Sequence, residues 1–504
     1  MLQQEQKLNL GQYTFLYDLL VKKDDDLRRL HDEVDLSFVY SELHEKYCID
    51  NGRMAVSPIR MFRYLLLKVI FDLSDVSVVK RSLTDMSFKY FLDMQPEDTD
   101  LIDPSTLCKF RKYRLKDSNL LTMLIGKTIS MAKQKGIITK GTIIVDATHT
   151  HSRALVFDPV AYLHMRIQRL KHSLEQLCPQ LVGSFPTIPK GADLDTLLES
   201  TQEIITLVEE DKTVEKIPAA KNQFELLKEA HDDVLSRGYV SKDKDARHGH
   251  KSATKPFYGT KEHLAVEAES GLVCAAVVSS GEKVDGKFLP ELVKQSRENG
   301  VDAECVVADK AYSTTDNLEK ADSEAVDIDG KPILDNNGNP KKNFILYSPI
   351  TRNVSQGVRG NTEFQYNKDA GTMACPAGHL AIRKRYKSRK SERGENPAMV
   401  YFFDTDKCKV CPLREGCYKG TKTKVFQQRI LSDMHKDHIE FEKTEDFKRH
   451  MKVRYKIEAK NADLKHNYGL GRAKSYGMKN MTMQTTLSIF ACNLKRILRL
   501  TAAK

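Results

Sequence analysis

Apolar positions in the first 135 residues recur at helical spacing. The stretch SPIRMFRYLLLKVIFDLSDVSVVKRSL, residues 57–83, contains long apolar helical runs. The stretch DPSTLCKFRKYRLK, residues 103–116, opens with Asp-Pro and Ser-Thr, which favour a helix start, and continues as a basic helix. The pattern predicts a helical N-terminal domain over residues 1–135. The basic helix suits a helix-turn-helix-like DNA contact through Lys109 and Arg111, although an ordinary solvated surface explains it equally well.

The pattern changes after residue 140, where short apolar runs end in acids. Ile143, Ile144 and Val145 precede Asp146, as at the end of a buried strand. The stretch KEHLAVEAESGLVCAAVVSSG, residues 261–281, predicts two strands around a Glu-Ser-Gly turn. A helix is predicted over about 287–299, and ECVVADKAYS then predicts a strand ending in Asp309. Residues 158–240 between these strands are expected to form a polar helical insertion.

The C-terminal part is predicted to be irregular at first and helical later. Residues 323–350, rich in Asp, Asn, Gly and Lys, indicate an irregular excursion, and a charged helical run begins near 433. It leads into RYKIEAKNADLK, residues 454–465, which as a helix carries Arg454, Glu458 and Lys465 on one face. Spacing alone favours an ordinary surface ion pair, worth roughly 0.2–0.5 kcal/mol.

Composition adds a concentrated positive charge to this picture. The chain of 504 residues is 40% hydrophobic and 30% charged, which fits several folded domains, and its formal net charge is +11. Residues 451–504 hold twelve Lys and Arg against Glu458 and Asp463, an excess of ten that accounts for nearly all of the total. Such a concentration favours a polyanionic partner, DNA or RNA. The N-terminus lacks a signal-peptide pattern and no apolar run reaches a membrane span, so we expect a cytoplasmic protein.

Four of the ten cysteines cluster, and the other six are scattered singly, which argues against a disulfide framework. The cluster lies in CPAGH, residues 375–379, and CKVCPLREGC, residues 408–417. It offers thiolates for a tetrahedral structural Zn²⁺ site, with His379 as an alternative ligand; an unmetallated thiol cluster and a redox pair are the alternatives. The insertion is also expected to present three cations to DNA. The four cysteines are Cys375, Cys408, Cys411 and Cys417, and the cations are Arg383, Lys384 and Arg385.

Three carboxylates on separate predicted elements suggest a common chemistry. Asp146 and Asp309 end apolar strands, and Glu458 lies on a late helix. Paired divalent cations that cleave phosphodiester bonds are held by such acids, because hard Mg²⁺ prefers carboxylate oxygen. Each Asp alone is more often a turn former or a helix cap.

The stretches IIVDATHTHSRA, GTKEHLAVEAESGL, VVADKAY and RYKIEAKNADLKH resemble the DDE transposases of bacterial insertion sequences. The resemblance is to the superfamily of insertion-sequence families four and five, is strongest to the eleven-eighty-two family, and covers most of the chain. It implies an α/β fold: an RNase H-like core of a mixed sheet flanked by helices, with a helical N-terminal domain and two insertions. The core is expected in residues 136–157, 241–320 and 431–504, the helical insertion in 158–240 and the zinc-knuckle-like insertion in 321–430.

The same resemblance implies roles for individual residues. Asp146, Asp309 and Glu458 would bind two Mg²⁺ or Mn²⁺ ions, and Arg454 and Lys465, at the signature spacing, would contact DNA phosphates. Lys310 is a candidate for the same contact. The signature tyrosine position holds Met451, with Tyr455 nearby. The implied activity is cleavage at insertion-sequence ends and joining of the 3′-OH to target DNA, by a homodimer on double-stranded DNA that carries terminal inverted repeats.

Two other functions stay open at this point. His149 and His151, a His-x-His pair after a strand, are similar to the metal ligands of barrel hydrolases, although the repeating strand–helix pattern of a barrel is not found. A catalytically inactive, sequence-specific DNA-binding protein derived from a transposase is the second alternative. Retention of all three acids argues against it.

Overall fold

The computed structural model describes most of the chain. The described residues are 11–48, 54–116, 120–138, 141–175, 177–211, 214–252, 255–325, 332–334, 338–350, 364–367, 369–388, 397–429 and 433–502. Among them, no helix is both long enough and apolar enough to cross a membrane.

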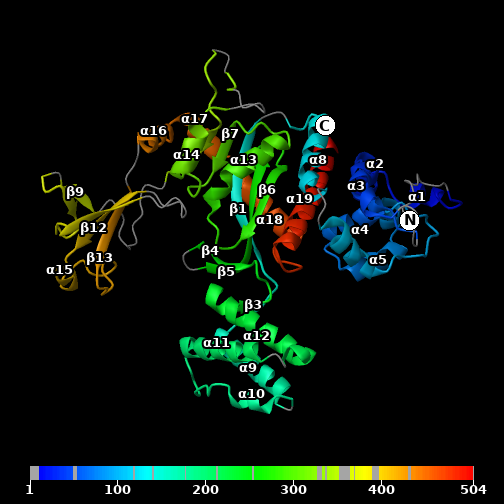
Figure 1. Ribbon diagram of the computed structural model, residues 1–504. Coiled ribbons are helices and arrows are strands. Elements are labelled where there is room, and N and C mark those ends of the chain that lie inside the picture. The colour runs from blue at the N-terminus through cyan, green and yellow to red at the C-terminus, as the bar shows by residue number, and fades with distance from the viewer. Residues whose placement is uncertain are drawn as a thin grey trace.

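A six-stranded mixed sheet forms the centre of the molecule (Figure 1). The strands are β1 (Thr142–His151), β4 (Arg247–Ser252), β5 (Lys255–Glu267), β6 (Val273–Ser280), β7 (Cys305–Ala308) and β8 (Ile345–Tyr347). Their order is β4-β5-β1-β7-β8, and β6 also pairs with β5. Strand β5 is antiparallel to β1, β4 and β6, whereas β7 is parallel to both β1 and β8. The two strands predicted around the Glu-Ser-Gly turn are β5 and β6.

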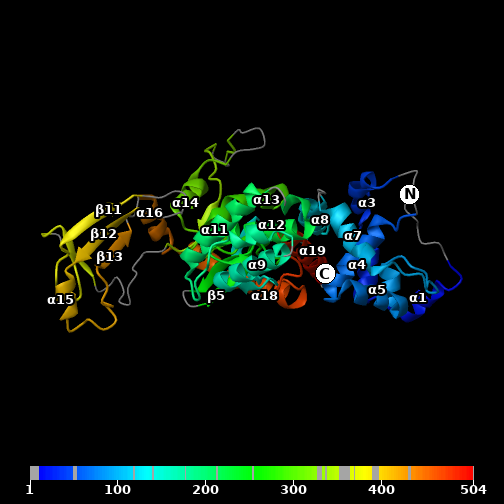
Figure 2. The ribbon, with the colours of Figure 1, turned by 60° about the horizontal axis from the view of Figure 1, so that its bottom comes forward.

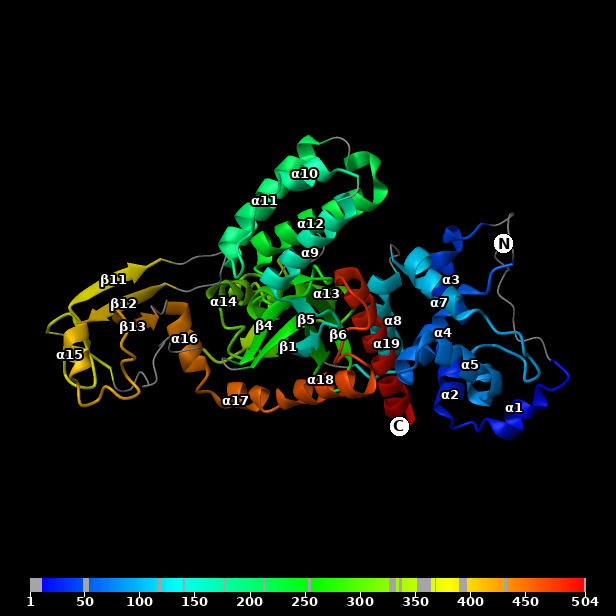
Figure 3. The same ribbon diagram turned by 90° about the horizontal axis from the view of Figure 1, so that it is seen from below.

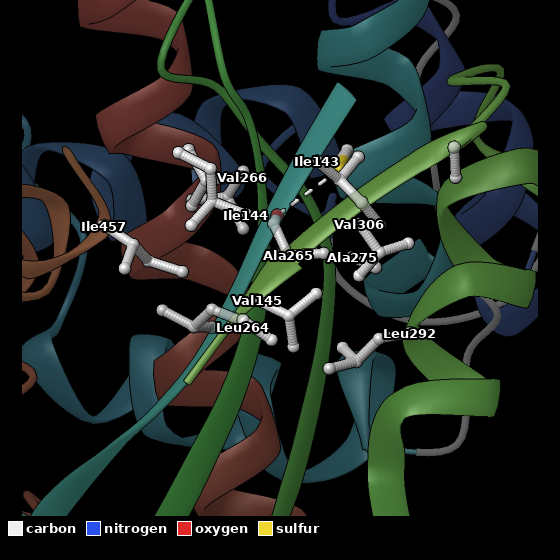
Figure 4. Close-up of a cluster of buried hydrophobic side chains, with 14 of the residues drawn as sticks. Ile143, Ile144, Val145, Leu264, Ala265, Val266, Ala275, Leu292, Val306 and Ile457 are labelled. Carbon is white, nitrogen blue, oxygen red and sulfur yellow. Dashed lines mark hydrogen bonds between the residues drawn. The ribbon is translucent and has the colours of Figure 1, made fainter. Parts of the chain in front are cut away.

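Helices cover both faces of this sheet, which confirms the predicted α/β class in outline. The central strands read as nearly continuous apolar runs because both faces are buried. Figure 4 shows Ile144 and Val266 beside Ile457 of α18, and Val145 beside Leu292 of α13. The flanking helices are α8 (Leu120–Gln134), α13 (Leu289–Glu298), α14 (Thr315–Asp322), α18 (Tyr455–Asn467) and α19 (Met478–Ala502).

The N-terminal part is helical, as predicted, and has a hydrophobic core of its own. Asp103 caps α7 by accepting a hydrogen bond from the Ser105 N–H, and Pro104 stands in the first turn. The last helix, α19, lies between the N-terminal helices and the sheet (Figure 3). Its Phe490 and Leu494 belong to the N-terminal core, whereas its Ile489 and Ile497 belong to the core of the sheet. The N-terminal helices are α1 (Phe15–Leu20), α2 (Asp26–Glu33), α3 (Ser37–Leu43), α4 (Pro58–Ile70), α5 (Asp75–Thr84), α6 (Met86–Phe91) and α7 (Pro104–Phe110), followed by a π-helical turn (Arg111–Leu115).

Two further units are inserted into the sequence that forms the sheet and its flanking helices. The first is a helical bundle with its own core, joined to the sheet region through the short strands β2 (Val156–Phe157) and β3 (Val240–Ser241). Its helices are α9 (Pro159–Leu174), α10 (Pro179–Gly183), α11 (Leu194–Glu210) and α12 (Pro218–Arg237).

The second inserted unit, which we call the cysteine module (residues 364–429), is a small β structure with a separate aromatic core. Figure 2 shows it at the opposite end of the molecule from the N-terminal helices. After it, α16 (Asp433–Phe441), α17 (Glu445–Met451) and α18 lead back to the sheet. The module comprises β9 (Gln365–Asn367), β10 (Thr372–Ala374), β11 (Arg383–Lys387), β12 (Ala398–Phe403), α15 (Thr405–Lys409) and β13 (Lys424–Arg429).

Two sequence predictions need correction. Asp146 lies within β1 and not at its end, because β5 continues to pair with β1 as far as His151. Only the ladder to β7 stops just before Asp146, at Val145. The excursion predicted over 323–350 also contributes a core strand, β8, whose Leu346 and Tyr347 are buried. The predicted domain boundaries stay a prediction.

Candidate active site

Asp146 and Asp309 lie side by side on adjacent parallel strands. The ladder between β1 and β7 pairs Val145 with Ala308. Because the register of parallel strands advances one residue at a time, the next positions on the two strands are Asp146 and Asp309. Both side chains therefore project from the same face of the sheet, at the point where β7 ends and β1 continues.

This pair of acids is partly buried, which makes the ionised form of both carboxyl groups less favourable. Burial raises the pKa of Asp146 to about 6, and the nearby charge of Asp309 adds to the shift, against the opposing effects of the Ala147 N–H and Arg454. Burial likewise raises the pKa of Asp309, while the Ala311 N–H, which donates to its Oδ1 at 2.9 Å, opposes the shift. A cation placed between the two carboxylates would offset both costs.

Helix α18 packs across the face of the sheet from which Asp146 projects. Ile457 is fully buried there, and the Asn461 Nδ2 donates a hydrogen bond of 3.0 Å to the Asp146 Oδ2. Arg454, directly before the helix, is close enough to lower the pKa of both aspartates. Lys465 lies further along α18 and is half-buried. Burial lowers its pKa, and Asp146 is close enough to oppose that shift. The predicted helix thus brings two of its cations to the aspartate pair.

Glu458 borders this site but is not directed into it. Its side chain is 58% exposed, and its carboxylate forms a 2.6 Å ion pair with Arg454, the i,i+4 pair that spacing alone favoured. Among the described residues, no three His, Cys, Asp or Glu side chains stand close enough together to hold a metal ion. The three predicted acids therefore share one region, with the two aspartates adjacent and Glu458 on its edge.

Sequence reasoning missed four polar groups around the aspartates. Asn461 is one, and its Oδ1 is buried without a hydrogen-bond partner in the part of the chain that the structure describes. Asp285, paired with Lys261 at 2.8 Å, is near enough to raise the pKa of both aspartates. The hydroxyl of Tyr312 is buried beside the same acids, no described residue hydrogen-bonds to it, and burial raises its pKa. The signals were present, since Asn461 lies one turn after Glu458 and Tyr312 three residues after Asp309.

The fourth missed group is Glu262, which explains the position of Lys465. Glu262 is fully buried, and burial raises its pKa to about 7 although Lys465 lowers it. Its Oε1 accepts a 2.8 Å hydrogen bond from the Thr260 hydroxyl, and its Oε2 has no hydrogen-bond partner among the described residues. Glu262 pairs with Thr148 in the ladder between β1 and β5, on the same face as Asp146. An acid on the sheet thus lies near the lysine of α18.

The other predicted DNA-binding residues are spread over three regions. Lys310 is exposed beside Asp309. Lys109 is exposed on α7, whereas Arg111 is held by Asp75 through bonds of 3.0 and 2.6 Å. Arg383 and Arg385 are exposed on β11 of the cysteine module, along with Lys384, and Arg383 lies 4.1 Å over the ring of Phe402. Of these residues, Lys310 lies beside the aspartate pair, whereas the others lie on the N-terminal helices and on the cysteine module.

The four predicted zinc ligands come together in the cysteine module. Cys375, Cys408, Cys411 and Cys417 line one small cavity with His379, and all four are free thiols. Burial raises the pKa of the Cys408 thiol, and the other three cysteines add to the effect. The module therefore groups the predicted ligands around one cavity, although no metal-holding set of three or more His, Cys, Asp or Glu side chains is found among the described residues.

The remaining predicted residues, His149, His151, Met451 and Tyr455, are described by their packing and exposure. His149 and His151 lie on β1 of an open sheet with ring centroids 5.2 Å apart, and His149 also contacts Phe257. Burial lowers the pKa of His149 to about 4. Met451, at the signature tyrosine position, packs on the core of the sheet, whereas Tyr455 is 64% exposed. Tyr455 therefore does not take the inward place that Met451 fills.

Comparison with protein families gives two matches. The model described as Transposase domain (DUF772) matches residues 15–113, and the model described as Transposase DDE domain matches residues 374–498. Comparison with curated proteins and with solved structures gives no match. The second match includes Glu458, Lys465 and the cysteine cluster, and it ends before the last residues of α19. One match covers most of the N-terminal helices, and the other covers the helix beside the aspartate pair. Because both matched models are transposase models, the chain is a DDE transposase of the insertion-sequence type, an enzyme that acts on DNA.

Proposed function

We propose that Asp146, Asp309 and Glu458 are the catalytic acids that cleave DNA at insertion-sequence ends and join the freed 3′-OH to target DNA. The observation that carries this proposal is the parallel register that sets Asp146 beside Asp309, facing α18. The strand order and directions, with β5 running opposite to β1 and with β6, β7 and β8 running in the same direction as β1, support assigning the sheet to the RNase H-like class. Which insertion-sequence family the chain represents stays a prediction.

The residues at the site suit divalent cations. Asp146 and Asp309 supply hard carboxylate oxygens, and their raised pKa values reflect a crowding of negative charge that cations relieve. Glu458 completes the set by turning away from Arg454. When bound, two Mg²⁺ or Mn²⁺ ions would supply activation of water and then of the 3′-OH, and stabilisation of the leaving oxygen.

The protein's own side chains orient the acids and the DNA. Asn461 fixes the Asp146 carboxylate by a hydrogen bond to one oxygen, which leaves the other oxygen for a ligand. Arg454, once Glu458 has moved to the ligand set, is released to contact a DNA phosphate. Lys465 and Lys310 make further phosphate contacts, because neither has a reason to transfer a proton here.

Three broader proposals accompany this function. The four grouped cysteines would hold one structural Zn²⁺ that stabilises the cysteine module, as their thiol donors suit. A homodimer would hold two element ends together on DNA. An enzyme with this substrate would work in the bacterial cytoplasm, at the nucleoid.

A plasmid assay tests the proposed function. Supercoiled DNA that carries the terminal inverted repeats is incubated with protein and Mg²⁺ or Mn²⁺. We expect nicks at the element ends, lost in the variants Asp146→Ala, Asp309→Ala and Glu458→Ala. Asp463→Ala, an acid on the same helix paired with Lys460, is the matched control and should nick normally. Nicking that survives loss of either strand aspartate overturns the assignment, and DNA retention without any cleavage would instead indicate an inactive binding protein.

A further inference from the structure

Tyr312 places a buried hydroxyl beside the aspartate pair, three residues after Asp309 in the chain. Its side chain is 1% exposed and packs in the core of the sheet. No described residue hydrogen-bonds to the hydroxyl. A buried hydroxyl without a partner destabilises a fold, and such groups are rare in native proteins. This one therefore points to a ligand that the hydroxyl binds.

The backbone around Tyr312 is held firmly, so the ring has a fixed place. The Tyr312 N–H donates to the Asp309 carbonyl at 3.1 Å. The buried Asn317 Nδ2 donates to the Tyr312 carbonyl at 2.9 Å and to the Gly286 carbonyl at 2.8 Å. These bonds tie the loop after β7 to the 3₁₀ helix η4 (Asp285–Phe288). A Cβ atom at Gly286 would lie 2.6 Å from a carbonyl oxygen of this loop, so the two segments are in close contact.

Three acids from three elements lie near the Tyr312 hydroxyl. Asp285 comes from η4, Asp146 from β1 and Asp309 from the end of β7. Burial raises the pKa of Tyr312, and each of the three acids raises it further. The phenol therefore keeps its proton and can both donate and accept a hydrogen bond. None of these three carboxylates accepts a hydrogen bond from it, so a small bridging molecule is needed to connect them.

Water is the molecule that suits this position. Because Tyr312 is almost fully buried, a DNA phosphate cannot reach its hydroxyl without rearranging the core, whereas water is small enough to do so. Mg²⁺ usually keeps several of its waters when carboxylates bind it. On the opposite side of the Asp146 carboxylate, the buried Asn461 Oδ1 is a second acceptor to which no described residue donates. Both groups could be satisfied by water that arrives with a divalent cation.

We infer that the Tyr312 hydroxyl holds, by a hydrogen bond, a water molecule that enters the site with the divalent cation bound by Asp146 and Asp309. Tyr312 is thus a positioning residue, which acts through water and not by direct contact with the carboxylates. Water is the first nucleophile of the proposed reaction, so a group that fixes its place near the ion also favours the geometry of attack. The inference rests on the proposed function for the identity of the ion's ligands.

The variant Tyr312→Phe removes the hydroxyl and keeps the ring, so it tests the hydrogen bond without disturbing the packing. In EDTA, its urea midpoint should equal or exceed that of the wild type, because no described residue loses a partner. Tyr347→Phe is the matched control, since Tyr347 is 2% exposed on β8 and its hydroxyl donates to the Asp446 Oδ2 at 2.7 Å. The control should have a lower urea midpoint and the wild-type affinity for Mn²⁺.

Metal binding then distinguishes the two tyrosines. The Mn²⁺ affinity of Tyr312→Phe, measured by electron paramagnetic resonance, should fall about two- to tenfold, the range set by one hydrogen bond. Oxygen-17 relaxation of solvent water measures how fast water exchanges at protein-bound Mn²⁺, and this exchange should become faster in the variant. DNA is absent from both measurements, so a hydroxyl that contacts only a phosphate would leave them unchanged.

Two results would overturn the inference. One is a Tyr312→Phe variant with wild-type Mn²⁺ affinity and water exchange. The other is a metal-free urea midpoint that falls as far as that of Tyr347→Phe, which would show that the hydroxyl has a partner within the protein. If Asp146→Ala still nicks the element ends while Tyr312→Phe loses Mn²⁺ affinity, the proposed function fails and the water site stands. If Asp146→Ala abolishes nicking and Mn²⁺ binding whereas Tyr312→Phe changes neither, the function stands and the inference fails.

Discussion

Asn461 offers the sharpest test of how the site holds its charge. Its Nδ2 donates a 3.0 Å hydrogen bond to Asp146, whose pKa is raised to about 6 by burial and by Asp309. The substitution Asn461→Ala removes a donor that favours the ionised carboxylate. Because metal ligands must be deprotonated, the variant should need a higher pH to bind Mn²⁺.

The size of this effect follows from the bond that is lost. A hydrogen bond to a charged group contributes about 1.5–3 kcal/mol, and a tenfold change in an ionisation equilibrium corresponds to about 1.36 kcal/mol. The pH midpoint of Mn²⁺ binding should therefore rise by about one to two pH units. At pH 7 the ionised fraction of Asp146, and with it the Mn²⁺ affinity, should fall about two- to tenfold.

Electron paramagnetic resonance of free Mn²⁺ measures this binding directly, and the chain contains no Trp that could report it by fluorescence. Titrations between pH 5 and about 9 should show two shifted curves that converge at the alkaline end, where Asp146 is ionised in both proteins. Asn467→Ala is the matched control, since the Asn467 Nδ2 donates to the Asp463 Oδ1 at 2.7 Å on the exposed side of the same helix. Identical midpoints for Asn461→Ala and wild type would refute the reasoning.

Three further outcomes are expected. Asp146→Asn should stabilise the metal-free protein at pH 7 by at most about 3 kcal/mol. The carboxyl has a pKa of about 6 in the folded protein against an ordinary value of 3.8, so the native state loses stability as the pH rises between these values. The gain in Tm should therefore vanish below about pH 4. Ile457→Ala, at a fully buried position between α18 and the sheet, should cost about 2–5 kcal/mol in urea unfolding, and an unchanged midpoint would contradict that packing. Cys411→Ser should lower the zinc content found by mass spectrometry, and a zinc-free wild-type protein would remove the zinc proposal.

Much of the sheet could be predicted from the sequence because its strands are short apolar runs with clear limits. Asp309 ends its strand as expected, and the turn after β5 lies where Glu-Ser-Gly predicted it. The position of Asp146 within β1 could not be predicted in the same way. Its continuation, ATHTH, has few apolar residues and is a strand because β5 supplies a partner for it, which is a tertiary effect.

The surroundings of the acids were harder to predict than the acids themselves. Asn461 and Tyr312 can be recognised as part of the site only once the fold brings them beside the aspartates. Asp146 and Asp309 are more than a hundred residues from α18 along the chain, and Asp146 is on a different strand from the one that precedes Tyr312. Arg111 shows the reverse case, since its basic setting suggested exposure, whereas Asp75 from another helix neutralises it. A sequence gives the identity and spacing of charges, but not which of them are already paired.

Helix α19 has a consequence for when this enzyme can act during its own synthesis. Its residues close both the N-terminal core and the core of the sheet. A ribosome adds about 5–20 residues each second, so the aspartates emerge many seconds before residues 478–502. Until then neither hydrophobic core is complete, and α18 cannot pack stably against the sheet beside Asp146. A nascent chain, or one broken before residue 478, should therefore carry Asp146 and Asp309, which we propose as catalytic acids, without being able to cut the DNA of the cell that makes it.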